Sequence, residues 1–193
     1  MTEKNDFFFL KEAGVKFLPF VGDNYENGIS FDEEGRLILG TAEKPGKKVL
    51  IINQCHYCDE DLTDEEMSSF TRDVLEWYLD ARKCGNTTLW MNTFLKFERA
   101  LANEITEAKD SASIWGHLMF YNYLQVPLKG ARMSGNQGSV LSCGMETREY
   151  NIDGKRIKVL PVCHPAADYS WDYWHEIIVD FLNGDSIETM DSI

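Results

Sequence analysis

Residues 47–58 read KKVLIINQCHYC: two lysines lead into a four-residue aliphatic run, which breaks into polar and reactive side chains. A continuous apolar run of this kind is typical of a strand buried on both faces of a parallel sheet. In open α/β sheets, ligands bind just beyond the carboxyl ends of such strands. We therefore expect residues 53–58 to lie at a ligand-binding edge of the sheet.

The length of 193 residues and a hydrophobic content of 44% predict one globular domain over 1–193. Within it we expect an N-terminal arm over 1–46 and a frayed tail over 185–193. No segment has the length of a membrane span, and no export signal is recognisable. The sequence therefore predicts a cytoplasmic protein without membrane contact, whose five cysteines are reduced thiols.

The net charge of −13 repels nucleic acid at long range, so any contact with DNA needs a locally basic surface. One region of the chain, between Gln125 and Pro165, has more basic than acidic residues. Its basic residues are Lys129, Arg132, Arg148, Lys155, Arg156 and Lys158.

Helices and strands alternate after the opening stretch. Thr63 and Glu66 have the spacing of a helix capping box, and the helix they start should end near Gly85. A second helix is expected over 90–107, a short helical piece over 111–115 and a second strand over 117–124. Two strands separated by helices predict a parallel α/β sheet. Four aromatic residues of the helices are expected in the core: Trp77, Trp90, Phe94 and Phe97.

The last third of the chain contains a hairpin signal. Asp153-Gly154 separates two alternating segments, 148–152 and 155–160, which is the pattern of a tight two-residue turn. We expect the second arm to continue as a buried strand over 159–162 into Cys163 and His164, and a short further strand over 139–144. A final helix should begin after Ser170 and end at Asn183-Gly184.

Three predicted strand ends now carry NQCHYC (53–58), FYNY (120–123) and CHPA (163–166). In this order the blocks resemble the uracil-DNA glycosylase superfamily, particularly its divergent bacterial members. The similarity extends over about 17–182 and includes LPFVGDNY (18–25). The resemblance implies a three-layer α/β/α fold with a small, mostly parallel central sheet. It also implies a monomer that needs no cofactor or metal and acts on DNA containing uracil or a damaged base.

The first motif of that superfamily, Gly-Gln-Asp-Pro-Tyr-His, falls on residues 53–58. Gln54 and Tyr57 match in type, so the resemblance makes them base-binding residues, and we include His56 of the same loop with them. The aspartate that positions water falls on Cys55, a departure at a catalytic position. The resemblance makes Asn122 the residue that reads the base and His164 the catalytic donor to the leaving uracil.

The loop after the third block is the one that such proteins press into DNA, and here it would include Ala166, Asp168 and Tyr169. Lys129 and Arg132 are candidate phosphate contacts. Tyr169 or Trp171 could stand exposed as a wedge.

The chemistry can be argued from the residues alone. A base processed outside the helix is read in a snug pocket through its Watson–Crick edge, and a side-chain amide offers a donor and an acceptor together. A histidine donor aimed at the uracil O2 would stabilise charge on the departing base. Cys55 is a poor acceptor for the attacking water, because a buried thiol stays neutral.

Several alternatives stay open. The protein could be a base-binding or nucleotide-binding module that has lost hydrolysis, which Cys55 favours. A third alternative is a metal-dependent or thiol-dependent protein that uses Cys55, Cys58 and His164. Cys55 and Cys58 form a Cys-x-x-Cys pair, but a structural zinc site needs four ligands and Cys84, Cys143 and Cys163 occur singly, so we predict no metal. Asn122 and His164 could also serve only to satisfy backbone groups.

Overall fold

Two parallel strands, β4 (Val49–Asn53) and β5 (Leu118–Asn122), lie at the centre of the computed structural model, which describes residues 7–128, 147–165 and 169–184. Their register pairs Asn53 with Asn122, so both strands end at the same edge. The short strand β1 (Phe20–Val21) pairs with β5 in the antiparallel sense, and the order in this part of the chain is β1-β5-β4. The sheet is therefore small and mixed in direction.

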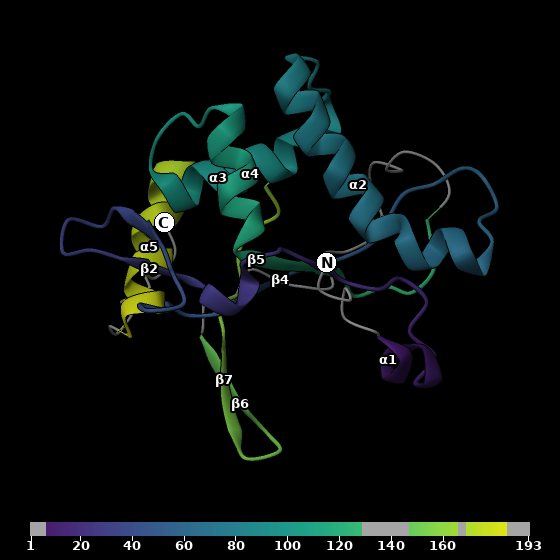
Figure 1. Cartoon of the computed structure of the whole chain (residues 1–193), viewed down its shortest axis with the longest axis horizontal. Helices are drawn as coiled ribbons and strands as arrows, with labels where there is room; N and C mark the ends of the chain where they lie inside the picture. Colours follow the sequence, from purple (N-terminus) through teal and green to yellow (C-terminus); the bar gives the residue numbers. More distant parts are fainter. Residues whose placement is uncertain (1–6, 129–146, 166–168, 185–193) are drawn as a thin grey trace, which may run out of the picture.

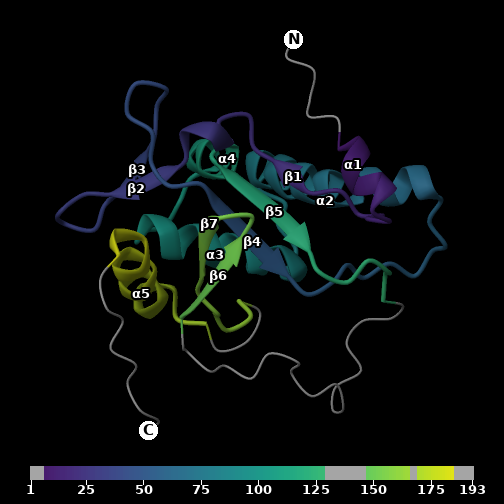
Figure 2. The same ribbon diagram turned by 90° about the horizontal axis from the view of Figure 1, so that it is seen from below.

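The crossover between β4 and β5 is helical. Helices α2 (Asp64–Cys84), α3 (Asn92–Ala102) and α4 (Ala108–Gly116) lie together on one side of the two strands (Figure 1; Figure 2). The capping box is confirmed: Thr63 Oγ1 accepts from the Glu66 amide, and the Glu66 carboxylate accepts from the Thr63 amide. Gly85 ends α2 with a φ of 70°, a left-handed conformation that suits glycine.

The single helix expected over 90–107 is wrong. A short 3₁₀ turn η2 (Leu89–Met91) leads into α3, and Asn103 ends α3 in the left-handed conformation with a φ of 55°. Asparagine tolerates this conformation better than most residues, so it can end the helix. Ile105 lies beyond the helix end and is exposed. The separate helix α4 agrees with the piece expected over 111–115.

The remaining elements flank this unit. Strands β2 (Ile29–Phe31) and β3 (Leu37–Leu39) form an antiparallel pair, and α1 (Phe8–Glu12) and the 3₁₀ turn η1 (Tyr25–Asn27) belong to the N-terminal part. Helix α5 (Trp171–Asn183) ends at Gly184, as expected. It packs against α3, where the His175 Nδ1 lies 2.8 Å from the Ala100 carbonyl oxygen.

The aliphatic run of β4 is not buried on both faces. Leu50 is 42% exposed and Ile52 is 57% exposed, whereas Ile51 packs on the core beside the buried Phe120. The prediction fails because α2, α3 and α4 cover one side of the strand pair. Within the described part of the chain, β4 is also an outer strand.

An aromatic cluster fills the space between the helices and the covered face of the sheet. Phe94 makes edge contacts with Trp115 and Phe120, with ring centroids 5.5 and 5.3 Å apart. Phe97 is also buried, as the sequence predicted. Trp77 and Trp90 are exposed, so the expectation that they lie in the core is wrong.

The hairpin signal at Asp153-Gly154 is confirmed. Strands β6 (Arg148–Ile152) and β7 (Lys155–Val159) pair antiparallel across these two residues, whose φ values are both positive, 50° and 76°. The second arm does not become a buried strand, because β7 is largely exposed and residues 160–164 form no strand. The further strand expected over 139–144 lies outside the described residues.

One buried carboxylate ties α2, α3 and α4 together. Glu98 is completely buried on α3, and its Oε1 accepts hydrogen bonds from the hydroxyls of Thr106 and Ser111. Its Oε2 accepts from the Trp115 indole at 3.2 Å, and the guanidinium of Arg82 on α2 lies 3.4 Å from Oε1. Burial and the nearby Glu98 charge together raise the pKa of the Tyr78 hydroxyl.

No helix among the described residues combines the length and hydrophobicity needed to span a lipid bilayer. The described structure therefore mixes helices with small sheets, in agreement with the α/β class.

We predict that Glu98→Ala lowers the free energy of unfolding by about 3–5 kcal/mol, because it leaves the Arg82 charge in a mostly buried site without its partner. Urea denaturation measures the change. Glu104→Ala, at an exposed position just after α3, is the matched control and should change stability by less than about 0.5 kcal/mol. An equal loss in both variants would show that the Glu98 network does not hold the helices together.

Candidate functional site

The carboxyl ends of β4 and β5 continue side by side into the two motifs that follow them. The Tyr123 amide donates to the Asn53 carbonyl and the Leu124 amide donates to the Gln54 carbonyl, each at 2.9 Å. Farther along, Leu128 exchanges backbone hydrogen bonds with His56 and Cys58. The fold thus places residues 53–58 directly beside 122–128, at the edge where ligands bind in open α/β sheets.

Asn122 is the most enclosed residue of this edge, with 0% of its surface exposed. Its Nδ2 faces the imidazole ring of His56, 2.9 Å from Nε2 and 3.5 Å from Nδ1, whereas Oδ1 has no hydrogen-bond partner among the described residues. An amide turned by 180° would place Oδ1 on the ring and leave Nδ2 without a partner. In either orientation one group of the amide has no partner among the described residues.

His56 is buried between two aromatic side chains. Its ring centroid is 5.0 Å from that of Phe17 and 4.8 Å from that of Phe70. The Thr71 hydroxyl lies 2.9 Å from the same Nε2 that faces Asn122. Burial lowers the pKa of His56 from 6.5 to about 4, so the imidazole is neutral at pH 7 and the single lone pair of an unprotonated Nε2 can accept from the Thr71 hydroxyl.

Gln125 holds the N-terminal segment against this edge. Its Oε1 accepts from the backbone amides of Lys16 and Phe17, each at 2.9 Å. Its Nε2 donates to the Tyr121 hydroxyl and to the Asn122 carbonyl. One side chain therefore fixes both the end of β5 and the segment that carries Phe17 over His56.

The other residues predicted in the first motif lie differently. Gln54 and Tyr57 are exposed, and Cys55 is buried. No carboxylate occurs within 53–58, so the motif itself supplies no charged acceptor for a water molecule. The fold thus brings His56 and Asn122 into contact and leaves Gln54 and Tyr57 at the surface.

The third predicted block lies on the segment between β7 and α5. His164 and Cys163 are half-buried there, and Cys163 packs against the core. The predicted DNA contacts Lys129, Arg132, Ala166 and Asp168 lie outside the described residues. His164 follows a segment without strand structure, so its predicted place at a strand end is wrong.

An exposed wedge at Tyr169 is not what the structure shows. Its side chain is 5% exposed and stacks on Trp174, with ring centroids 5.7 Å apart and planes at 12°. Burial raises the pKa of its hydroxyl. Trp171 is half-buried and packs against the core. Neither ring can enter DNA without leaving these contacts.

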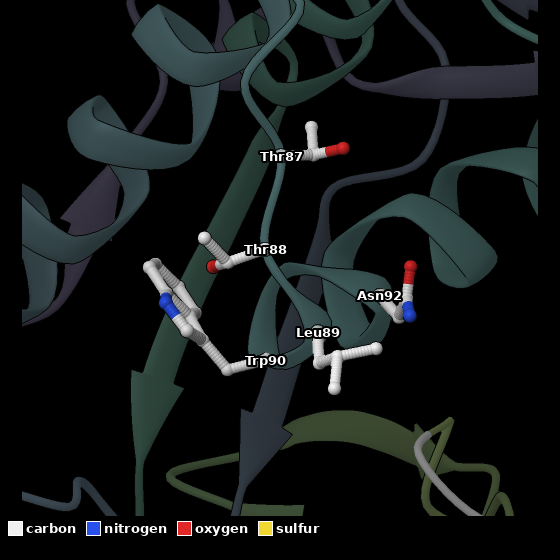
Figure 3. Close-up of a pocket in the computed structure, with 5 residues that line it drawn as sticks. All are labelled: Thr87, Thr88, Leu89, Trp90 and Asn92. Atoms are coloured by element: carbon white, nitrogen blue, oxygen red, sulfur yellow. The ribbon is translucent and has the colours of Figure 1, made fainter.

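Two other features bear on the search for a site. Within 7–128, 147–165 and 169–184, no three His, Cys, Asp or Glu side chains gather as a metal centre would require. An open hollow on the surface belongs to the loop between α2 and α3 and contains none of the predicted site residues (Figure 3). It is lined by Thr87, Thr88, Leu89, Trp90 and Asn92.

Sequence reasoning missed Thr71, Gln125 and the role of Phe17. Thr71 had a signal, because it lies on the same stripe of α2 as the buried Met67, Leu75 and Tyr78. A polar residue on an apolar helical stripe needs a buried partner. Gln125 had none, since its role depends on the fold bringing residues 16 and 17 to the end of β5.

No known protein family, curated protein or solved structure matches this chain.

We predict that His56 makes the protein less stable in mild acid. Its pKa of about 4 in the folded state lies below the 6.5 of the unfolded state, so the unfolded chain takes up the proton first. The free energy of unfolding should therefore fall as the pH drops from about 6.5 towards 4, by up to about 3 kcal/mol from this group.

Urea denaturation across this pH range, with His56→Gln as the comparison, isolates the effect. The glutamine can still accept from Asn122 but does not titrate, so its stability should depend less on pH. Carboxylates elsewhere titrate in both proteins and cancel in the difference. Parallel pH profiles for the two proteins would contradict the prediction.

Proposed function

We propose that this protein recognises a flipped-out uracil or damaged base in DNA at the carboxyl ends of β4 and β5. The observation that supports it is the fully buried Asn122, held by His56 with one amide group left unpartnered. The two residues come from the first two blocks of the resemblance to uracil-DNA glycosylases, and they meet at one edge. Independent blocks that converge in space support a common site.

The proposal includes the finer fold, a three-layer α/β/α arrangement around a small, mostly parallel sheet. The parallel pair β4–β5 with a helical crossover supports it. Two features differ from that arrangement. Strand β1 pairs with β5 in the antiparallel sense, and helices α2, α3 and α4 lie on one side of the strand pair.

The amide chemistry suits uracil. Its Watson–Crick edge carries an N3–H donor between two carbonyl acceptors, whereas cytosine has a bare acceptor at N3. With Nδ2 engaged by the neutral ring of His56, the Oδ1 of Asn122 would accept from N3–H. Cytosine would instead place its N3 lone pair against Oδ1. His56 is thus a positioning residue that sets the amide orientation.

A base can reach Asn122 only after the Phe17 segment that covers it has moved. The side chain is closed off from solvent, and Phe17 is completely buried beside His56. The Phe17 segment is held through Gln125. Recognition in this site therefore requires an opening step in which Phe17 moves and the base takes its place among aromatic side chains.

Hydrolysis makes a further demand. The bond between the base nitrogen and the sugar carbon breaks, its electrons pass to the base, and water adds to the carbon while losing a proton to an acceptor. His164 would donate towards the uracil O2. The acceptor is the weak point, because the buried Cys55 stands where the resemblance has an aspartate.

A second candidate function follows from that substitution. A protein that kept the base-reading amide but lost the water-activating acid would bind the base without releasing it. The buried Cys55 and the absence of a carboxylate within 53–58 favour this non-catalytic module.

Binding experiments test base recognition. The probes are oligonucleotides with one deoxyuridine or with deoxycytidine at the same position. Wild-type protein should prefer the deoxyuridine probe, and Asn122→Ala should lower that preference about tenfold, as expected when a polar partner is lost. Asn53→Ala, at the register partner on β4, is the matched control and should keep the preference. Thermal unfolding verifies that both variants fold. A wild-type protein without any preference for deoxyuridine would reject the proposal.

Release of uracil separates the enzyme from the binding module. The expected result for an enzyme is alkali-sensitive cleavage of the deoxyuridine strand, with His164→Ala lowering the rate about 100-fold and leaving affinity unchanged. Retained binding without product, even at high protein concentration, would establish the non-catalytic module.

A further inference from the structure

The β6–β7 hairpin stands away from the rest of the protein as a two-stranded arm (Figure 1). All ten of its strand residues except Val159 are exposed. Residues 148–159 contain four basic and two acidic side chains, in a chain whose net charge is −13. The arm is therefore a basic projection on an acidic protein.

The strand register sorts the side chains onto two faces. Tyr150 pairs with Ile157 and Ile152 pairs with Lys155, so these residues share one face with Arg148. The opposite face carries Glu149, Asn151, Arg156 and Lys158, with an exposed ion pair of 3.7 Å between Arg156 and Glu149. One face is thus apolar in its middle, and the other is charged.

The apolar face is open to solvent. Tyr150 is 47% exposed, Ile152 is 54% exposed and Ile157 is 43% exposed. Cations lie at both ends of this strip, Arg148 at the base of the arm and Lys155 beside the turn. The two are roughly 13 Å apart along the strand direction. An aromatic ring between two cations is the arrangement that binds unpaired nucleic acid.

The base of the arm adds a small hollow against α5. Its volume is about 110 Å³, and its wall includes Arg148 and Lys158 together with Glu149, Thr147 and Phe181. The cations at this end of the arm therefore border a recess rather than a flat surface.

We propose that this face of the hairpin is a binding platform for an unpaired stretch of DNA. Tyr150 stacks on a base, and Arg148 and Lys155 contact the phosphates on either side of it. The inference rests on the proposed function, because its ligand is DNA. Charge complementarity supports a polyanion on the basic arm, and the exposed Tyr150 ring beside the cations favours one with unpaired bases.

Fluorescence anisotropy with a single-stranded oligonucleotide and the corresponding duplex tests the stacking residue. Tyr150→Ala should lower affinity for the single strand about tenfold and affinity for the duplex less than about twofold. Tyr150→Phe keeps the ring and should bind as wild type does. Unchanged single-strand affinity, or an equal loss on the duplex, would overturn the proposal.

Salt dependence tests the cations. Arg148→Gln with Lys155→Gln should make the slope of log affinity against log salt shallower by about 1.4 for the single strand. The control, Lys11→Gln with Lys44→Gln, changes the net charge equally at exposed positions elsewhere and should leave the slope unchanged. Equal slopes for the two double variants would contradict the proposal.

The probes also separate this inference from the proposed function. Hairpin variants should weaken deoxyuridine and deoxycytidine strands equally, whereas Asn122→Ala should weaken only the deoxyuridine strand. Binding that depends on Tyr150 without a deoxyuridine preference would keep the platform and reject base reading. If every hairpin variant keeps full affinity and still prefers the deoxyuridine strand, the result would keep base reading and reject the platform.

Two further results would overturn the platform. One is wild-type protein that binds no probe at low salt. The other is a dimer that Tyr150→Ala dissociates without changing DNA affinity, which would show that a second copy covers this face.

Discussion

The buried carboxylate of Glu98 is the constraint on which the helical layer depends. A charge without solvent is tolerated only when every lone pair meets a donor, and here the donors come from Arg82 of α2, Ser111 and Trp115 of α4, and Thr106 of the connecting segment. If one of these partners were absent, the Glu98 carboxylate would lack a hydrogen bond in an apolar interior. The three helices therefore pack as one unit over the covered face of the sheet.

That packing determines the candidate site. The Glu98 network holds one end of α2 through Arg82, and the other half of the same helix carries Phe70 and Thr71 onto His56. His56 in turn holds the Asn122 amide at the end of β5. The site is thus a buried polar pair whose geometry is inherited from the helical layer. Its neutral histidine follows from the same burial, which disfavours the charged ring.

Local chemistry explains which features could be predicted. Thr63 with Glu66 and Asp153 with Gly154 act within a few residues, so the start of α2 and the hairpin followed from their spacing alone. The break at Asn103 and the open face of β4 could not be read in this way. An asparagine such as Asn103 can continue a helix or end it, so its identity does not reveal the break. The exposure of β4 depends on which helices cover the strand. Trp77 and Trp90 were misplaced for a related reason, since a helical stripe shows periodicity but not which side meets the core.

The sequence by itself determined the two parallel strands, the caps of α2 and the hairpin, because hydrophobic period, capping groups and turn residues act locally. It also placed Asn122 and the 53–58 motif at the same edge, because parallel strands share their carboxyl ends. Only the tertiary structure decided that His56 rather than Gln54 meets Asn122, that Thr71 and Gln125 complete the site, and that Tyr169 turns inward. The physical reason is that burial and hydrogen-bond partners are set by contacts between residues far apart in the chain.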